Sequence, residues 1–157
     1  MLFKRETAIG PIAIGEKDGF IAYLHLPGET ARLRNFGATD EEPPVVREAF
    51  RQLELYLDGA LKKFDLPLKP EGTPFMRKVW DALLTVPYGV TASYKDIAEA
   101  VGSPKAVRAV GLANARNPIA IFIPCHRIIG SSGKLVGFGG GLELKQRLID
   151  LEARHSR

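Results

Sequence analysis

Cys125 is the only cysteine in this 157-residue chain, and His126 and Arg127 follow it directly. A lone thiol cannot form an internal disulfide or a multi-cysteine zinc site, so it either packs in the core or reacts. A single buried cysteine usually behaves as a small apolar residue. The charged neighbours favour reactivity, because a cationic setting lowers the pKa of a thiol and increases the nucleophilic thiolate. The sequence leaves packing open and makes Cys125 the first candidate nucleophile.

Composition gives this thiol an ordinary globular context. The chain is 45% hydrophobic and 25% charged, which is enough for one full core or two small ones. No apolar stretch is long enough to span a bilayer, and residues 1–6 lack the apolar segment of a secretory signal. One unpaired cysteine fits a reducing compartment, so we expect a cytoplasmic location and no membrane partner.

The positive charge is concentrated in the half that carries Cys125. Residues 1–70 contain ten Lys/Arg and eleven Asp/Glu, whereas residues 71–157 contain twelve and seven. A basic surplus suits a polyanion such as nucleic acid. A small excess of Lys and Arg is also common in proteins in which these residues only increase solubility.

The first half, residues 1–70, predicts a small sheet and a helix. Two β-prone apolar runs, 9–14 and 20–26, flank Asp18-Gly19, which is a strong hairpin signal. Pro43-Pro44 then opens a segment that ends near Gly59. Its apolar residues recur at helical spacing and are Val46, Phe50, Leu53 and Leu57.

The second half, residues 71–157, begins with a helix and a capping signal. Thr73 is a predicted N-cap before Pro74 at the first helical position. The expected apolar face of that helix consists of Val79, Trp80, Leu83 and Leu84. Ser93 with Asp96 three residues later resembles a capping box, and the helix that it starts should end at Gly102.

A further helix is predicted to begin at Ser103-Pro104. It would place Val107, Val110 and Ala113 on a core face and its basic residues elsewhere. Two helices joined by a tight Gly-Ser-Pro turn predict a helix-turn-helix of the kind that binds DNA. An ordinary pair of antiparallel helices fits the same pattern.

Five ordered features from Thr73 to Glu152 carry a family resemblance. They are the Pro124-Cys125-His126-Arg127 motif, the preceding Asn117-Pro118, the helix-turn-helix with Arg108, the Ser93-Tyr94 pair, and Gly139-Gly140-Gly141-Leu142. In this region the chain closely resembles the DNA-repair alkyltransferases that act on 6-O-alkylguanine, the methylated-DNA-protein-cysteine methyltransferases. The first half resembles the N-terminal domain of that family more loosely.

The resemblance implies an α+β fold in two domains. Residues 1–70 would form a ribonuclease H-like sheet-and-helix domain, and residues 71–157 a mainly helical, winged-helix-like domain with the helix-turn-helix. It also implies a monomer that needs no cofactor. Some relatives bind zinc through Cys and His in the N-terminal domain, but three His and one motif Cys do not supply such a site here.

The implied chemistry is irreversible transfer of an alkyl group to Cys125. By the resemblance, His126 activates the thiol through a water, Glu152 orients His126, and Tyr94 donates to the leaving guanine. Because neighbouring residues of an extended segment point to opposite sides, His126 need not touch the thiol. Without the motif, the sequence would instead favour a surface position for His126 beside a core cysteine and a solvated position for Glu152.

The resemblance also assigns binding residues. The base would lie between Tyr94 and the 137–141 loop, where glycines permit close backbone approach. The expected substrate-binding residues are Asn117, Ile128, Phe138, Gly139 and Gly140. Phe138 and Gly139 replace the Tyr and Ser of some family members, which removes side-chain hydroxyl contacts and makes a different substrate range possible.

The expected partner is duplex DNA that contains alkylated guanine. The alkylated atom is hidden in the stack, so the nucleotide must be flipped out, and Arg108 would fill the space it leaves. Lys105, Arg116 and Ser131 are expected phosphate or groove contacts. Two alternatives are a lesion-binding sensor that transfers nothing, although such relatives lack the motif Cys, and a cysteine hydrolase that regenerates its thiol.

Overall fold

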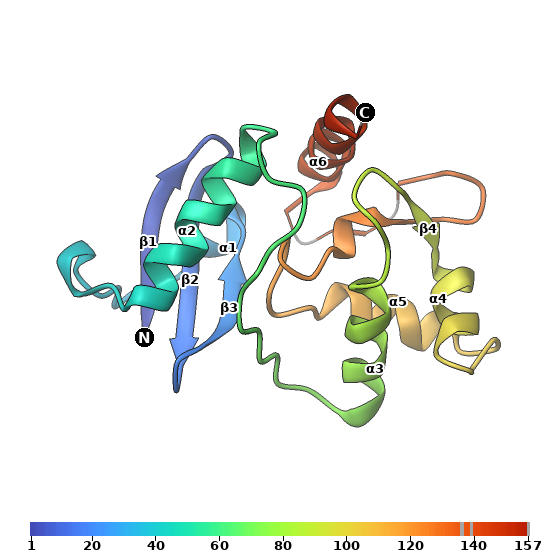
Figure 1. Cartoon of the computed structure of the whole chain (residues 1–157). Helices are drawn as coiled ribbons and strands as arrows, with labels where there is room; N and C mark the ends of the chain where they lie inside the picture. Colours follow the sequence, from blue (N-terminus) through green and yellow to red (C-terminus); the bar gives the residue numbers. More distant parts are fainter. Residues whose placement is uncertain (136, 139, 157) are drawn as a thin grey trace.

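The computed structural model, which describes residues 1–135, 137–138 and 140–156, begins with a three-stranded antiparallel sheet (Figure 1). Its strands are β1 (Leu2–Thr7), β2 (Gly10–Lys17) and β3 (Phe20–His25) in that order. The hairpin at Asp18-Gly19 is confirmed, with φ of 54° and 83°, as a type I′ turn requires. Strand β1 was not predicted, because Phe3 is its only buried residue and it shows no apolar alternation.

One long helix covers the sheet, and two short helical turns lie in the connection. Helix α1 (Pro27–Thr30) and the 3-10 turn η1 (Thr39–Glu41) lead to α2 (Pro44–Leu57), which packs against β2 and β3. The predicted helix is confirmed, and Gly59 follows it with φ of 79°. Leu57 is only half-buried, and Tyr56 is fully buried in its place.

Three helices form the centre of the second half. Helices α3 (Pro74–Leu83), α4 (Tyr94–Ala100) and α5 (Val107–Ala115) all contact one another. Both capping predictions are confirmed: Thr73 accepts from the Met76 amide at 3.2 Å, and Ser93 forms a complete capping box with Asp96. The indole of Trp80 donates to the carbonyl of Ala113 at 2.9 Å, which ties α3 to α5.

Two helix predictions were wrong in detail. Helix α5 begins at Val107 and not at Ser103, because residues 103–106 form a tight turn in which the Ala106 amide donates to Ser103 at 2.8 Å. Val107, in the first turn of α5, is 39% exposed. Leu84 is 48% exposed, because it caps the end of α3 and leaves the helix face that Val79, Trp80 and Leu83 bury.

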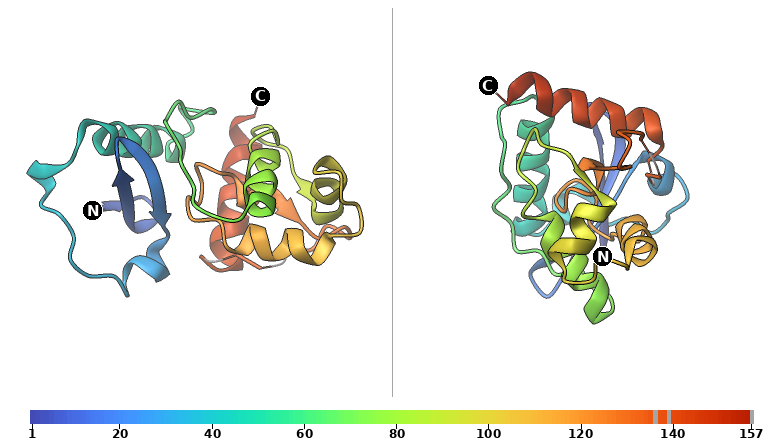
Figure 2. Two further views of the ribbon diagram at one scale, coloured as in Figure 1. Left: turned by 90° about the horizontal axis from the view of Figure 1, so that it is seen from below. Right: turned by 90° about the vertical axis from the view of Figure 1, so that its right-hand side faces the viewer.

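The C-terminal helix α6 (Leu142–His155) lies between the sheet and the helical part, as Figure 1 and the left view of Figure 2 show. It contacts the 3-10 turn η2 (Cys125–Arg127), and Arg147 donates to the carbonyl of Ala8 at 3.0 Å. The short parallel strands β4 (Ala92–Ser93) and β5 (Ile128–Ile129) pair with each other.

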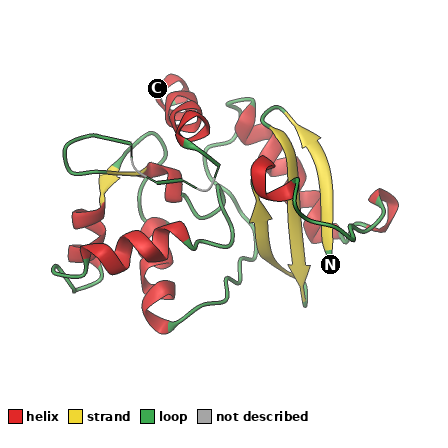
Figure 3. Cartoon of the chain, turned by 180° about the vertical axis from the view of Figure 1, so that it is seen from behind, coloured by secondary structure: helices red, strands yellow, loops and turns green. Residues whose placement is uncertain are grey.

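A single apolar cluster runs through both halves. The amide of Leu24 donates to Pro118 at 2.9 Å, so the edge of the sheet meets the segment that leads to the cysteine. Seen from behind in Figure 3, strand β3 is the strand nearest the helical part.

The chain as a whole has a mixed α/β fold. In the described part of the chain no helix combines the length and the apolar character needed to cross a membrane.

Candidate active site

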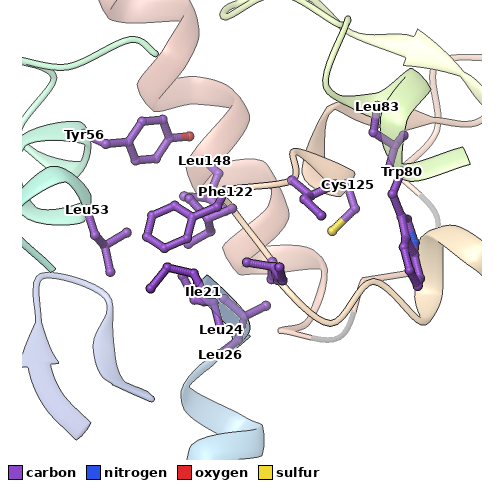
Figure 4. Packing of buried hydrophobic residues seen from close by; sticks show 14 of the residues in the cluster. Ile21, Leu24, Leu26, Leu53, Tyr56, Trp80, Leu83, Phe122, Cys125 and Leu148 are labelled. Carbon is purple, nitrogen blue, oxygen red and sulfur yellow. The ribbon is translucent and has the colours of Figure 1, made fainter. Parts of the chain in front are cut away.

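Cys125 opens the turn η2, at the end of an apolar segment that is buried but irregular. Residues 119–123 form turns and isolated bridges, and Ile121 has φ of 71°. The expectation of an extended segment at Cys125 and His126 was wrong, because Cys125–Arg127 curls into a 3-10 turn. The thiol residue is 5% exposed and belongs to the apolar cluster drawn in Figure 4.

Cys125 also lines a cavity of about 150 Å³. The described lining residues are Leu26, Glu29, Asn114, Ala115, Asn117, Ala120, Cys125, Gly137 and Phe138. Two of them, Leu26 and Glu29, come from the first half of the chain, so the cavity is built jointly by both halves. A buried thiol that faces a cavity is both a packing residue and a group that a ligand can reach.

Only part of the predicted base-binding set lines this cavity. Asn117 and Phe138 do, whereas Tyr94, Ile128 and Gly140 are not among its described lining residues. Ile128 is fully buried in β5, beside Ala92 of β4. Gly139 lies outside the described residues.

The ionisation of the thiol differs from the expectation drawn from its cationic neighbours. Burial raises the pKa of Cys125, and the Asn117 amide and the Lys145 ammonium only oppose that effect. Arg127 does not help, because its guanidinium is held by Glu152 and by the carbonyl of Val86 at 2.7 Å. A base is therefore needed to produce the thiolate.

Glu152 of α6 gathers hydrogen bonds from three other segments. Its Oε1 accepts from Arg127 Nε at 2.8 Å and from the Gly89 amide at 3.0 Å. Its Oε2 accepts from His126 Nε2 at 2.6 Å, Tyr56 Oη at 2.5 Å and Arg127 Nη2 at 3.1 Å. Burial acts to raise the pKa of Glu152, but the donors His126, Arg127 and Tyr56 outweigh it and lower the pKa to about 2.

His126 is completely buried beside this carboxylate. Burial lowers the pKa of His126, although Glu152 acts in the opposite direction. The contact with an anionic carboxylate requires the proton on Nε2, which leaves Nδ1 as the basic nitrogen. Nδ1 is buried and has no hydrogen-bond partner among the described residues. The imidazole is thus a neutral base with a fixed tautomer.

Two asparagines fix the backbone around the thiol. Asn117 donates to the carbonyl of Ile123 at 2.8 Å and accepts from the Ile119 amide at 3.0 Å. Asn114 of α5 lies 3.5 Å from the carbonyl of Cys125. Asn117 therefore holds the segment between the end of α5 and Cys125 in one conformation.

The predicted DNA contacts are all at the surface. Arg108 and Arg116 lie on α5 and just after it, and Lys105 lies in the preceding turn. These three and Ser131 are exposed. All four side chains are therefore accessible to a partner.

Several members of the site were not predicted. Tyr56, Glu29 and Leu26 belong to the first half, in which the sequence shows no catalytic cluster. Arg127 was expected only as part of the Pro-Cys-His-Arg motif and as a positive neighbour of the thiol, without a contact to Glu152, and the Gly89 amide carries no side-chain signal. Since these contacts join segments far apart in the sequence, no local pattern reveals them.

Fold and site together define a class of protein. The chain combines two helices joined by a tight turn, a buried cysteine that lines a cavity and a buried His126-Glu152 pair. This is the arrangement of a DNA-binding domain with a cysteine active centre. Residues 74–154 match the family model described as 6-O-methylguanine DNA methyltransferase, DNA binding domain.

Relatives of known name cover nearly the whole chain. A methylated-DNA--protein-cysteine methyltransferase of Methanosarcina barkeri is 49% identical over 152 residues, which span 97% of this chain and 96% of the relative. The constitutive Bacillus subtilis protein of the same name is 46% identical over 153 residues, with coverage of 94% and 92%. The chain belongs to the family of methylated-DNA-protein-cysteine methyltransferases.

A solved structure supports the same relationship. The crystal structure of Mycobacterium tuberculosis OGT in complex with DNA has a TM-score of 0.89 and 43% identity, covering 98% of this chain and 93% of that one.

In the described part of this chain, no group of three or more His, Cys, Asp or Glu residues is placed to hold a metal ion.

Proposed function

We propose that this protein repairs 6-O-alkylguanine in duplex DNA by moving the alkyl group to Cys125, once per molecule. The observation that carries the proposal is the single thiol at a cavity, next to a buried His-Glu pair, in a family member with a helix-turn-helix. In the reaction a carbon-sulfur bond forms at Sγ, and the bond between the alkyl carbon and the guanine oxygen breaks. The thioether has no resolving cysteine, so the protein is consumed.

Thiol activation is assigned to His126 and Glu152. Glu152 holds the Nε2 proton of His126, so Nδ1 can take the thiol proton, with a water as carrier as the family resemblance implies. The buried Lys145 and the Asn117 amide favour the thiolate once it forms. The fully extended geometry first expected is not needed for this step.

The leaving group requires a proton or a strong hydrogen bond, since expulsion of a guanine anion is costly. We assign this role to Tyr94 at the start of α4. Burial raises the pKa of Tyr94, and the nearby thiolate of Cys125 acts in the same direction. The phenol therefore stays protonated and able to donate at neutral pH.

Recognition of the lesion is assigned to the cavity and to α5. The flipped base would be held at Cys125 by Asn117, Phe138 and the adjoining loop, and Arg108 would replace it in the stack. Lys105, Arg116 and Ser131 would contact phosphates or the groove, and binding would be largely independent of sequence.

The finer organisation follows the same family resemblance. We propose that residues 1–70 form a ribonuclease H-like domain and residues 71–157 a winged-helix-like domain. We further propose that the protein acts as a monomer in the cytoplasm.

Replacing Cys125 by Ser tests the proposal. We expect Cys125→Ser to lose all alkyl transfer from a duplex with one 6-O-methylguanine, because a serine hydroxyl is a far weaker nucleophile at this site. Binding to that duplex, measured by fluorescence anisotropy, should remain within about threefold of the unmodified protein, because phosphate contacts dominate affinity. Residual transfer by Cys125→Ser would exclude Cys125 as the acceptor, and unmodified Cys125 after complete repair would instead indicate hydrolysis.

A further inference from the structure

Tyr56 joins the first half of the chain to the candidate active site. It lies near the end of α2 and is fully buried. Its hydroxyl donates to Glu152 Oε2 at 2.5 Å and lies 3.3 Å from His126 Nε2. The donor and acceptor are 96 positions apart in the sequence. This contact therefore exists only when both halves of the chain are folded against each other.

The ring of Tyr56 is fixed by aromatic neighbours. Tyr88 packs against it edge-on at 6.1 Å between centroids, and Phe64 packs at 5.2 Å. The imidazole of His126 also packs at 6.5 Å with a steep interplanar angle of 62°. The hydroxyl consequently has one direction in which to point, and that direction is the Glu152 carboxylate.

The hydroxyl proton of Tyr56 points to Glu152 Oε2. Glu152 is ionised, so Oε2 can only accept, and Tyr56 and His126 must both donate to it. A charge-assisted hydrogen bond of this length is among the stronger kinds in proteins. Tyr56 thus shares with His126 the oxygen that fixes the imidazole tautomer.

We infer that Tyr56 is a positioning residue for alkyl transfer, which acts through Glu152 to keep His126 neutral and oriented with Nδ1 free to serve as the base. The inference rests on the proposed function and extends the reactive network into the first half of the chain.

The number of hydrogen-bond donors to Glu152 Oε2 decides in which direction the pKa of His126 moves when the Tyr56 hydroxyl is removed. Without the Tyr56 proton, the carboxylate of Glu152 becomes more basic and stabilises a positive charge on His126 more strongly. The pKa of His126 then rises, and the neutral base is lost at a higher pH. The other titratable groups that act on His126, Glu152 or Tyr56 are Arg127 of η2, Lys145 of α6 and Tyr88 of the loop after α3. They are unchanged by removal of the hydroxyl.

Tyr56→Phe is the direct test, because it removes the hydroxyl and keeps the ring. The rate of methyl transfer from a 6-O-methylguanine duplex would be measured in single-turnover experiments across a pH series. We expect the acid limb of the profile to move to higher pH by roughly one to two units, since a hydrogen bond to a charged group has about that strength. Rates should converge with those of the unmodified protein at alkaline pH.

Tyr88→Phe is the matched control. Its hydroxyl is buried close to Tyr56 but has no hydrogen-bond partner among the described residues. The control variant should keep the acid limb of the unmodified protein. A limb displaced equally in both variants would overturn the inference, because the effect would then belong to the aromatic cluster.

Difluorotyrosine at position 56 supplies a second test that does not depend on whether Tyr56→Phe folds. Its more acidic phenol is a stronger donor of nearly the same shape, so the acid limb should move to lower pH. An unmoved limb in the difluoro protein, or a loss of rate in Tyr56→Phe that is the same at every pH, would contradict the positioning role. Failure of the unmodified protein to transfer methyl would instead refute the proposed function.

Discussion

Glu152 is the residue on which the polar network depends. It is 2% exposed, yet it accepts hydrogen bonds from three side chains and one backbone amide. A buried charge is stable only when it is paired in this way, and loss of one partner leaves the others uncompensated. The same carboxylate therefore stabilises the fold and orients His126.

Glu152→Gln should destabilise the protein by about 3 kcal/mol at neutral pH, because it leaves Arg127 buried without its counter-charge. The pKa of Glu152 is lowered from 4.5 to about 2, so its ionised form contributes fully above pH 4.5. That contribution is lost as the pH falls towards 2. The difference in free energy of unfolding between the two proteins should shrink over this window, measured by urea denaturation. A difference that does not vary with pH would contradict the assigned ionisation.

The residue types of the site were partly predictable. Cys125, His126 and Glu152 follow from the motif and the family resemblance, and the structure brings His126 and Glu152 into contact. The ionisation of the Cys125 thiol was not predictable, because its pKa depends on burial and on the direction of the Arg127 side chain. Both are properties of the folded chain, and the sequence shows only that a guanidinium is near.

At the scale of elements, local capping chemistry was the most dependable guide. Thr73 and the Ser93-Asp96 pair satisfy backbone groups at the starts of their helices, and Asp18-Gly19 adopts the positive φ angles that its turn requires. These structures follow from a few adjacent residues. The prediction of a helix start at Ser103-Pro104 was wrong, because the same residues suit either a helix start or a tight turn. They form the turn, so α5 begins four residues later, at Val107.

Arg108 of helix α5 is exposed, and the role in base flipping that we propose for it can be distinguished from a general effect of positive charge. Arg108→Ala should slow repair of a duplex lesion at least tenfold, yet leave reaction with free 6-O-alkylguanine base nearly unchanged, because only the duplex needs the vacated space filled. Both rates can be measured by following alkylation of Cys125. Arg47→Ala, an exposed arginine on α2, removes the same charge and should affect neither rate. Equal losses with duplex and free base in Arg108→Ala would argue against the role.

At the scale of the whole molecule, the two halves share one core and one site. The apolar cluster includes residues from the sheet, from α2 and from every helix of the second half. Tyr56, Leu26 and Glu29 reach from the first half to the site. The sequence predicted two domains that meet near residue 70 but no function for the first, since contacts between distant segments leave no local trace.

The shared core predicts cooperative unfolding. Trp80 is the only tryptophan and lies 1% exposed in the second half, so its fluorescence reports that half alone. Far-ultraviolet circular dichroism reports helices and strands of both halves. We expect the two urea transitions to coincide, as in a two-state protein. Well-separated midpoints would show that residues 1–70 and 71–157 unfold independently.

The most direct test of the account is the fate of the methyl group. After incubation with an excess of duplex that contains one 6-O-methylguanine, each protein molecule should carry one methyl group on the peptide with Cys125, and repair should stop at one lesion per protein. Mass spectrometry of the digest and counting of repaired duplex give both quantities. Repair of several lesions per protein, or a methyl group on any other residue, would contradict single-use transfer to Cys125.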